Sequence, residues 1–427
     1  MMRHRIGRRA AAALCWLGLV ASCVMADAAE RRSVLLLVSD NQNWNDCGCY
    51  GNRVVKTPHL DRLAAQGVRF NYAFATTASC GPSRAVLFTG LYTHQNGHYG
   101  HPQHYHNFHL RPEVQTIFAL LKKAGYSTGL IGKSNVSPPE QLPLDYQPAV
   151  RAYDVVSMAR EAAEFFRQAG DRPFFLLLGY HDPHPTSRAG SGWGIRRQYP
   201  GVRPVQYDPK TVIVPSYLPD RPEVREGLAG YYQQITRLDQ GIGMVLDALE
   251  RSGKAGETLI LFTSDHGSSE PGAMANHYDP GVRVPLIVKS PEQKQRGLVT
   301  DAMVTFADLV PTILDWTGVP GPAYPLPGRS FLPVLEERHP AGWDEVYLSH
   351  VFHEVQTYYP MRTIRTRRYK LIWNMAWRQE YPLPLDTIER ATWRGVVRRG
   401  DKTIGRRSVE KFLFRDPLEL YDLEKDP

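Results

Sequence analysis

The amino-acid sequence predicts a large α/β domain built on a doubly wound, mostly parallel sheet, followed by a smaller α+β domain with an antiparallel sheet. Three observations support this fold class. Four short apolar runs each end in polar residues, amphipathic helical stretches separate these runs, and a proline- and glycine-rich stretch precedes a group of shorter strand-like segments. At 427 residues the chain is long enough for one large and one small domain.

The four apolar runs are predicted to be buried parallel strands. They cover residues 33–38, 126–131, 173–178 and 258–262, and β-forming side chains are frequent in them. Because the carboxyl ends of parallel strands meet at one edge of a sheet, we expect the polar residues that follow these runs to form one site.

The remaining elements define the domain organisation. Helices are predicted at residues 114–123, 155–168 and 224–250, residues 311–316 close the large domain, and the proline- and glycine-rich stretch 319–328 marks its end. We therefore predict a large domain at 29–320 and a smaller domain at 321–427, with strands at 345–348, 362–365 and 369–373. The chain stops within a segment that reads as structured, so a terminal element of the smaller domain is expected to be missing.

The first 28 residues are predicted to be a secretory signal peptide. Four arginines precede an apolar run that ends at residue 25, and residues 26–28 offer a small-residue cleavage site. Residues 20–23 also fit a bacterial lipobox, in which Cys23 would carry a lipid anchor, and the sequence leaves both alternatives open. The run is short for a membrane span. We expect an exported protein, periplasmic or extracellular, in one alternative a lipoprotein.

Charge and cysteine content narrow the classes of partner. The formal net charge is +8, but no run of lysines and arginines is dense enough to predict nucleic-acid binding. The mild basic excess suits a polyanionic ligand. Outside the leader only Cys47, Cys49 and Cys80 remain, and this odd number argues against a disulfide framework and for a special role of one thiol. A homodimer is compatible with the sequence.

The strongest local signal is the run CGPSRAVLFTG at residues 80–90. It resembles the C-x-P-S-R-x-x-x-x-T-G signature of the type I sulfatases, which belong to the alkaline phosphatase superfamily. The resemblance implies that a maturation enzyme oxidises Cys80 to formylglycine, whose hydrated aldehyde carries one hydroxyl to attack sulfur and a second to expel sulfate. Arg84 would hold the modified side chain and offset negative charge.

The same resemblance implies a calcium site at two strand ends. Asp40 and Asn41 follow the first apolar run, and Asp265 and His266 follow the fourth. These residues match the two acidic or amide pairs that bind Ca²⁺ in the family, with the modified side chain of Cys80 as a further ligand. The ion would polarise the sulfate and activate the nucleophile.

The other two strand ends match further family residues. Lys133 corresponds to a lysine that contacts the nucleophile and the sulfate, and His184 corresponds to a histidine that binds sulfate or donates a proton. Anionic oxygens need fixed cationic donors, and a leaving group needs a proton, so both roles are chemically reasonable.

Further segments resemble one branch of the family, the N-sulfoglucosamine sulfohydrolases of heparan degradation. These segments are 91–97, 207–209, 311–316 and the run HEVQTYYPMR at 353–362, which lies outside the general signature. The resemblance implies that His353, Glu354 and Arg362 bind a sulfated carbohydrate substrate.

Three residues depart from the family pattern. Asn41 replaces a second aspartate, Asn135 stands where a histidine helps to eliminate sulfate, and Met274 stands where a lysine or arginine contacts sulfate. Asn135 and Met274 motivate a second hypothesis, a catalytically impaired relative that binds sulfated glycans. A third hypothesis is a phosphate or phosphonate ester hydrolase of the same superfamily, which the pair Asp265-His266 supports and the Cys80 motif opposes.

Overall fold

The computed structural model describes residues 32–186, 193–194 and 197–425. The predicted signal peptide and the predicted lipid attachment at Cys23 lie outside these residues. Within the described ranges, no helix combines the length and the apolar character that crossing a membrane requires.

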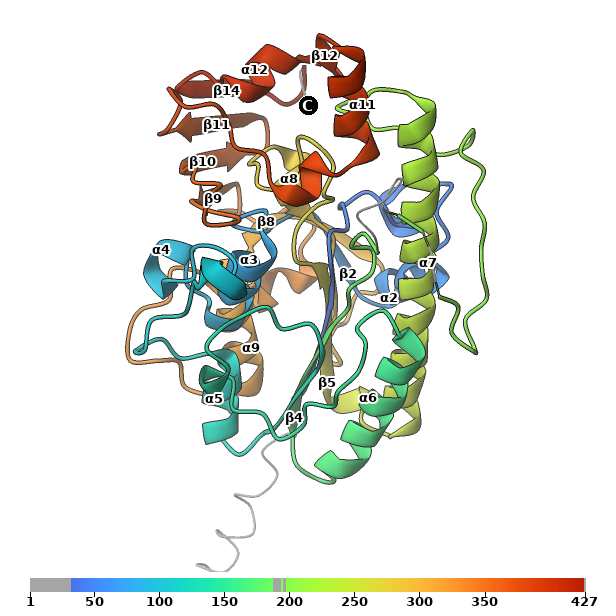
Figure 1. The fold of residues 1–427 in the computed structure, drawn as a ribbon. Coiled ribbons are helices and arrows are strands. Elements are labelled where there is room, and N and C mark those ends of the chain that lie inside the picture. The colour runs from blue at the N-terminus through green and yellow to red at the C-terminus, as the bar shows by residue number, and fades with distance from the viewer. Residues whose placement is uncertain (1–31, 187–192, 195–196, 426–427) are drawn as a thin grey trace, which may run out of the picture.

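A mixed sheet of eight strands forms the centre of the large domain (Figure 1). Its parallel half has the order β3 (Ser127–Gly132), β4 (Phe174–Gly179), β1 (Ser33–Ser39) and β5 (Thr258–Ser264). The other half contains antiparallel pairings and consists of β7 (Leu286–Lys289), β2 (Val68–Phe74), β6 (Arg283–Val284) and β8 (Leu298–Thr305). The four predicted strands are thus confirmed and form the parallel half.

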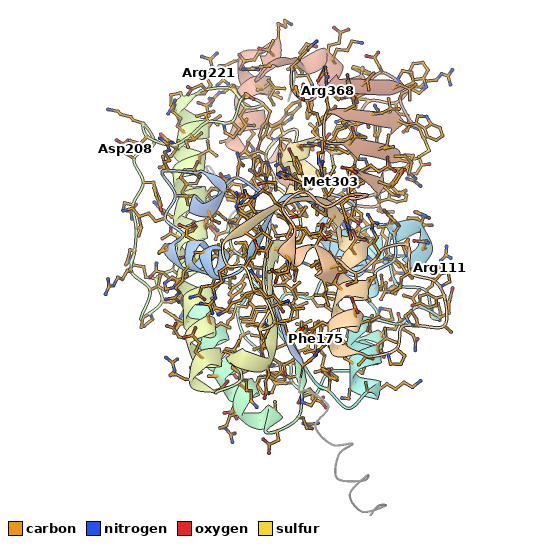
Figure 2. All side chains as sticks on the ribbon, turned by 180° about the vertical axis from the view of Figure 1, so that it is seen from behind. Arg111, Phe175, Asp208, Arg221, Met303 and Arg368 are labelled. Carbon is orange, nitrogen blue, oxygen red and sulfur yellow. The ribbon has the colours of Figure 1, made fainter. Side chains whose placement is uncertain are left out.

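Helices cover both faces of this sheet, which confirms the doubly wound architecture. One face carries α3 (Cys80–Thr89), α5 (Ile117–Lys123) and α9 (Leu309–Thr317), and the other carries α2 (Pro58–Gln66), α6 (Val155–Ala169) and the 30-residue α7 (Pro222–Arg251). Along β1, Leu36 packs with the first set while Leu35 and Leu37 pack with the second, because successive side chains point to opposite faces. Phe175 of β4 lies between the layers, whereas Arg111 and Arg368 lie on the outside (Figure 2).

The smaller domain is built on a separate antiparallel sheet with the order β14-β11-β10-β9. Its strands are β9 (Glu345–His350), β10 (Met361–Thr366), β11 (Tyr369–Asn374) and β14 (Leu418–Asp422), and its other elements are α10 (Leu385–Ile388), α11 (Ala391–Arg399), α12 (Val409–Leu413) and the pair β12 (Thr403–Ile404) and β13 (Arg407–Ser408). Two single-turn helices, α4 (Thr93–Asn96) and α8 (Asp279–Val282), belong to the large domain. The three predicted strands of the smaller domain are confirmed as β9, β10 and β11.

Ion pairs hold the two domains together at α8. Asp279 of α8 accepts from Arg365 of β10 at 3.0 Å and from Lys370 of β11. We call these three residues the junction cluster. Burial opposes ionisation of Asp279, but Lys370 and Arg365 hold its pKa well below the usual range. The cluster therefore remains charged at neutral pH and fixes the small sheet against the large domain.

Candidate active site

The carboxyl ends of the four parallel strands meet, as predicted, at the edge of the sheet that faces the smaller domain. Asp40 follows β1 and donates its backbone N–H to Asp182 O after β4 at 3.1 Å, and Asp265 follows β5 and donates to Ser39 O at 3.0 Å. Lys133 follows β3 and donates to Gly179 O at 2.7 Å. A Cβ at residue 179 would lie 2.0 Å from Lys133 O, so this close approach of two strand ends requires glycine.

Cys80 is the first residue of α3 and is buried at the same edge. The preceding Ser79 is extended, and its carbonyl accepts from Ser83 N at 2.8 Å. The Ser83 hydroxyl donates to Asp265 O at 2.5 Å, which ties the helix start to the end of β5. Cys80 is therefore held at a helix N-terminus, where the helix dipole favours negative charge.

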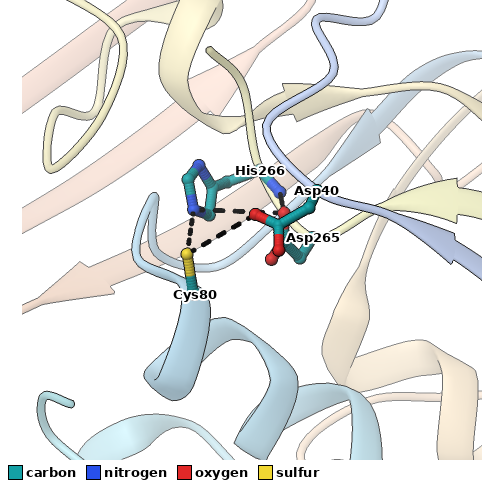
Figure 3. Close-up of side chains that lie close together, drawn as sticks. All are labelled: Asp40, Cys80, Asp265 and His266. Carbon is teal, nitrogen blue, oxygen red and sulfur yellow. Dashed lines mark hydrogen bonds and ion pairs between the residues drawn. The ribbon is translucent and has the colours of Figure 1, made fainter. Parts of the chain in front are cut away.

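Four side chains converge here, and we call them the Cys80 cluster: Asp40, Cys80, Asp265 and His266 (Figure 3). Their ligand atoms all lie within 4.8 Å of one another, and all four residues are buried. The sulfur of Cys80 is 3.7 Å from Asp40 Oδ1 and 3.2 Å from His266 Nε2. The fold thus brings together side chains that are more than 200 positions apart in the sequence.

The two pairs of predicted metal ligands adopt defined orientations. His266 Nδ1 donates to Gly267 O at 2.7 Å, which leaves Nε2 as an acceptor turned toward the Cys80 sulfur. Asn41 has a left-handed backbone with φ 67°, and its Oδ1 lies 4.0 Å from that sulfur. The buried Nδ2 of Asn41 has no hydrogen-bond partner among the described residues.

Two cations neutralise the buried carboxylates. Arg84 Nε donates to Asp265 Oδ2 at 3.0 Å and Nη2 lies 3.5 Å from Asp40 Oδ2, while Lys133 forms an ion pair with the same Asp40 oxygen. Burial alone would raise the pKa of Asp40, but Lys133, His184 and Arg84 hold it well below its usual range. Burial likewise opposes the charge of Lys133, yet Asp40 raises the pKa of its ammonium group. Both groups are therefore charged at neutral pH.

The Cys80 thiol, unlike Asp40 and Lys133, is uncharged at neutral pH. Burial raises its pKa well above the usual value, and the negative charges of Asp40 and Asp265 oppose the effect of Lys133. An unmodified thiol at this position stays protonated and is a weak nucleophile.

The loop after β4 brings His184 near the cluster. Arg237 of α7 donates to both oxygens of Asp182, at 2.7 and 2.5 Å, and Gln234 donates to His184 O at 2.9 Å, so the longest helix fixes this loop. His184 Nδ1 lies 3.0 Å from Pro185 O and 3.5 Å from Tyr153 Oη. Its Nε2 has no partner among the described residues and can act on a bound molecule.

Of the three predicted substrate residues of the smaller domain, one reaches the site directly. His353 is buried, and its Nδ1 lies 3.0 Å from the hydroxyl of Ser79, the neighbour of Cys80. Glu354 accepts from Leu385 N at 3.3 Å, and Arg362 donates to His350 O at 3.3 Å. The latter two side chains bond to the smaller domain itself.

Sequence reasoning missed two residues at this edge, His101 and Asp386. His101 Nε2 lies 3.1 Å from His353 Nε2, and its Nδ1 lies 3.4 Å from Asn135 Nδ2. Asp386 Oδ2 lies 3.8 Å from His353 Nε2. The dense histidine run at 98–109 was a signal for the first of them, whereas nothing in the sequence around residue 386 marks a site.

The chain matches two protein families. Residues 32–319 match the family described as Sulfatase, and residues 274–387 match the family described as N-sulphoglucosamine sulphohydrolase, C-terminal. Over 429 residues the chain is 37% identical to the human N-sulphoglucosamine sulphohydrolase, and this alignment covers 93% of the chain and 85% of the human protein.

Solved structures share the fold. One, described as a complex with the substrate D-glucosamine-2-N,6-O-disulfate, has a TM-score of 0.67 at 22% identity and covers 93% of this chain and 92% of its own. The phosphonate monoester hydrolase of Agrobacterium radiobacter has a TM-score of 0.64 at 19% identity and covers 86% and 94%. Since both kinds of enzyme share this architecture, the fold alone does not separate sulfate from phosphonate chemistry.

Proposed function

The chain belongs to the sulfatase family, and from this premise we propose that it hydrolyses the nitrogen–sulfur bond of N-sulfoglucosamine in heparan-type glycans. The match of residues 274–387 and the similarity to the human protein support this choice of substrate. The observation that carries the proposal is the position of Cys80. Its sulfur lies 3.7 Å from Asp40 Oδ1 and 3.2 Å from His266 Nε2, in a buried cluster beside two cations.

We propose that a maturation enzyme converts Cys80 to formylglycine. The conversion supplies a nucleophile that the unmodified side chain lacks, because burial keeps the thiol protonated and therefore poorly nucleophilic. Formylglycine supplies a hydrated aldehyde whose hydroxyl attacks sulfur. The surroundings suit a polar group at this position, since Asp40 Oδ1 and His266 Nε2 are both available as acceptors.

The residues of the Cys80 cluster fit a divalent cation, and we propose Ca²⁺. Carboxylate oxygens of Asp40 and Asp265 and the amide oxygen of Asn41 are ligands that calcium prefers. The imidazole of His266 is less usual for calcium and more typical of zinc or manganese, but its Nε2 is oriented to accept. When bound, the ion supplies Lewis-acid polarisation of the sulfuryl oxygens.

The remaining charged side chains have complementary roles in this proposal. Arg84 and Lys133 stabilise the negative charge that the sulfuryl oxygens carry in the transition state, and both are fixed by Asp40 before substrate arrives. His184 gives a proton to the leaving nitrogen through Nε2. The hydrogen bond from its Nδ1 to Pro185 O holds the ring in place.

Two measurements on the full chain test the proposal. Peptide mass spectrometry across residue 80 should find an aldehyde or its hydrate in place of the thiol, and incubation with N-sulfoglucosamine should release free sulfate. Release from an O-sulfated sugar but not from N-sulfoglucosamine would reject this substrate, and release from phosphonate monoesters alone would reject sulfatase chemistry.

A catalytically impaired, glycan-binding relative is the second candidate function, and two positions favour it. Asn135 is engaged with Gln103 and His101, and Met274 is buried, so neither supplies a proton or a charge to the sulfate. This alternative requires binding of N-sulfoglucosamine without sulfate release by protein whose residue 80 is fully converted. Calorimetry and the sulfate assay on the same preparation distinguish the two functions.

We also propose that the protein is exported, on the basis of its N-terminal leader. Sequencing of the mature N-terminus separates the two forms of processing. A start after residue 28 indicates plain cleavage, a lipidated Cys23 indicates a lipoprotein, and an intact leader on the functional protein contradicts export.

A further inference from the structure

A row of four aromatic rings leads from beside Cys80 to the molecular surface. We call it the ring ladder: His353, His101, His106 and Tyr105. In this order, successive ring centroids lie 4.3, 6.2 and 4.2 Å apart. The inner end lies at the active site, since His353 Nδ1 is 3.0 Å from the hydroxyl of Ser79, the residue before Cys80. The rings therefore form a continuous wall that runs outward from the reacting group.

Exposure to solvent rises along the ring ladder. His353 is buried, His101 and His106 are half-buried, and Tyr105 is exposed. At 71%, Tyr105 has the largest exposed fraction among the large apolar side chains that the structure describes. Because this ring stands at the end of a wall that begins beside Cys80, it is suited to cover part of a molecule bound in the site.

The loop that carries the outer rings is attached to the smaller domain. The N–H of His101 donates to His353 O at 3.0 Å, and the N–H of Val355 donates to His106 Nδ1 at 3.2 Å. Tyr105 directly precedes His106 in a short 3₁₀-helix. Its ring is therefore positioned before a ligand binds, which lowers the ordering cost of recognition.

The two middle rings of the ladder are uncharged at neutral pH. Burial and the neighbouring His353 hold the pKa of His101 well below its usual range, and burial also lowers the pKa of His106. This wall therefore offers ring faces rather than cations to a ligand. A pyranose ring presents C–H groups on its face, and such groups pack well against an aromatic ring.

We propose that Tyr105 and His106 form a binding site for the second sugar of a glycan whose terminal N-sulfoglucosamine lies at Cys80. This inference rests on the proposed function, because the terminal ring must place its sulfuryl group at the Cys80 cluster. The next ring then lies farther out along the ladder and packs its C–H face on Tyr105. The preferred substrate is thus the end of a chain rather than a free monosaccharide.

Substrate length separates this site from the reacting centre. We expect kcat/KM for a heparan tetrasaccharide that ends in N-sulfoglucosamine to exceed that for the monosaccharide by about fivefold. Tyr105→Ala should abolish this difference by lowering kcat/KM for the tetrasaccharide alone, mainly through KM, whereas Tyr105→Phe keeps the ring and should preserve it. The matched control is Tyr347→Ala, because Tyr347 is also an exposed tyrosine, at 52%, but lies outside the ring ladder; its ratio should equal that of the wild type.

Saturation-transfer NMR gives a second readout that needs no turnover. In the full chain with Cys80→Ala, the C–H protons of the second sugar of the tetrasaccharide should receive saturation, and they should lose it when Tyr105→Ala is added. If the wild type releases sulfate but Tyr105→Ala leaves either the ratio or this NMR signal unchanged, the inference is wrong and the proposed function stands. If the wild type releases no sulfate while the NMR signal depends on Tyr105, the proposed hydrolysis fails and the second-sugar site is supported.

Discussion

The Cys80 cluster and the junction cluster contain similar buried charges, but the protein satisfies them to different degrees. At the junction, both oxygens of Asp279 are engaged, Oδ1 by Lys370 and Oδ2 by Arg365. At the sheet edge, Lys133 and Arg84 both engage Asp40 Oδ2, while Oδ1 faces the Cys80 sulfur at 3.7 Å.

This difference separates a structural role from a binding role. Both oxygens of Asp279 bond to cations of the smaller domain, so the junction cluster serves to connect two domains. Among the described residues, the Oδ1 of Asp40 has no cation as partner and faces only the Cys80 thiol, beside the imidazole of His266, so it is prepared to coordinate an ion. Substitutions at the two clusters should therefore have opposite effects on activity and stability.

The largest effect is expected at Cys80. Cys80→Ala should reduce sulfate release by about 10⁴-fold or more, because the nucleophile is removed. The apparent Tm should change little. Cys47→Ala is the matched control, since Cys47 is buried but lies outside the cluster; it should retain activity and lower the Tm. Sulfate assays and thermal melts measure both, and full activity of Cys80→Ala would contradict the mechanism.

The junction cluster should show the reverse pattern. Asp279→Asn leaves Lys370 and Arg365 buried without their counter-charge, so we expect a loss of about 3 kcal/mol of stability. Sulfate release at 25 °C should remain within about twofold of wild type. Denaturant titration and the sulfate assay test this pair of outcomes, and a loss of activity with unchanged stability would place Asp279 in the site instead.

A smaller effect is expected when the donor set of the Cys80 cluster is changed. His266→Asn replaces an imidazole nitrogen by an amide oxygen, so the preference for Ca²⁺ over Zn²⁺ should rise by about tenfold. Competition calorimetry with the two ions measures the ratio. An unchanged ratio would mean that His266 does not contact the ion.

The smallest effect concerns pH. Folding lowers the pKa of Asp279 from its usual 3.8, so its ion pairs stabilise the protein above that value and lose this contribution as the pH falls below it. The difference in Tm between wild type and Asp279→Asn should therefore stay constant from pH 5 to 8 and shrink below pH 4. A difference that changes between pH 6 and 8 would point to another titrating group.

The sequence predicted the parallel half of the sheet much better than the other half. Strands β1, β3, β4 and β5 are buried on both faces and appear as continuous apolar runs followed by polar residues. The antiparallel strands were not predicted, because β6 and β7 have only two and four residues and β2 mixes buried and partly exposed positions. The sheet is mostly parallel, as predicted, but mixed, because β2 pairs in antiparallel fashion with β6 and β7, and β7 with β5.

The sequence likewise predicted only part of the candidate site. The strand-end residues around Cys80 were found because local sequence marks each strand end. His101 and Asp386 were missed because their importance comes from contacts across the chain, such as the 3.1 Å approach of His101 to His353, 252 positions later. Pairings of this kind depend on how the smaller domain sits on the sheet, which a single sequence does not encode in any local pattern.

Metal content of the intact chain tests most directly whether the Cys80 cluster is built to bind an ion. Native mass spectrometry of protein purified in Ca²⁺ should find one ion for each wild-type chain and for Asp279→Asn, and none for Asp40→Asn combined with Asp265→Asn. Wild-type protein without an ion, or a full ion content in the double variant, would contradict a metal-dependent centre at this edge of the sheet.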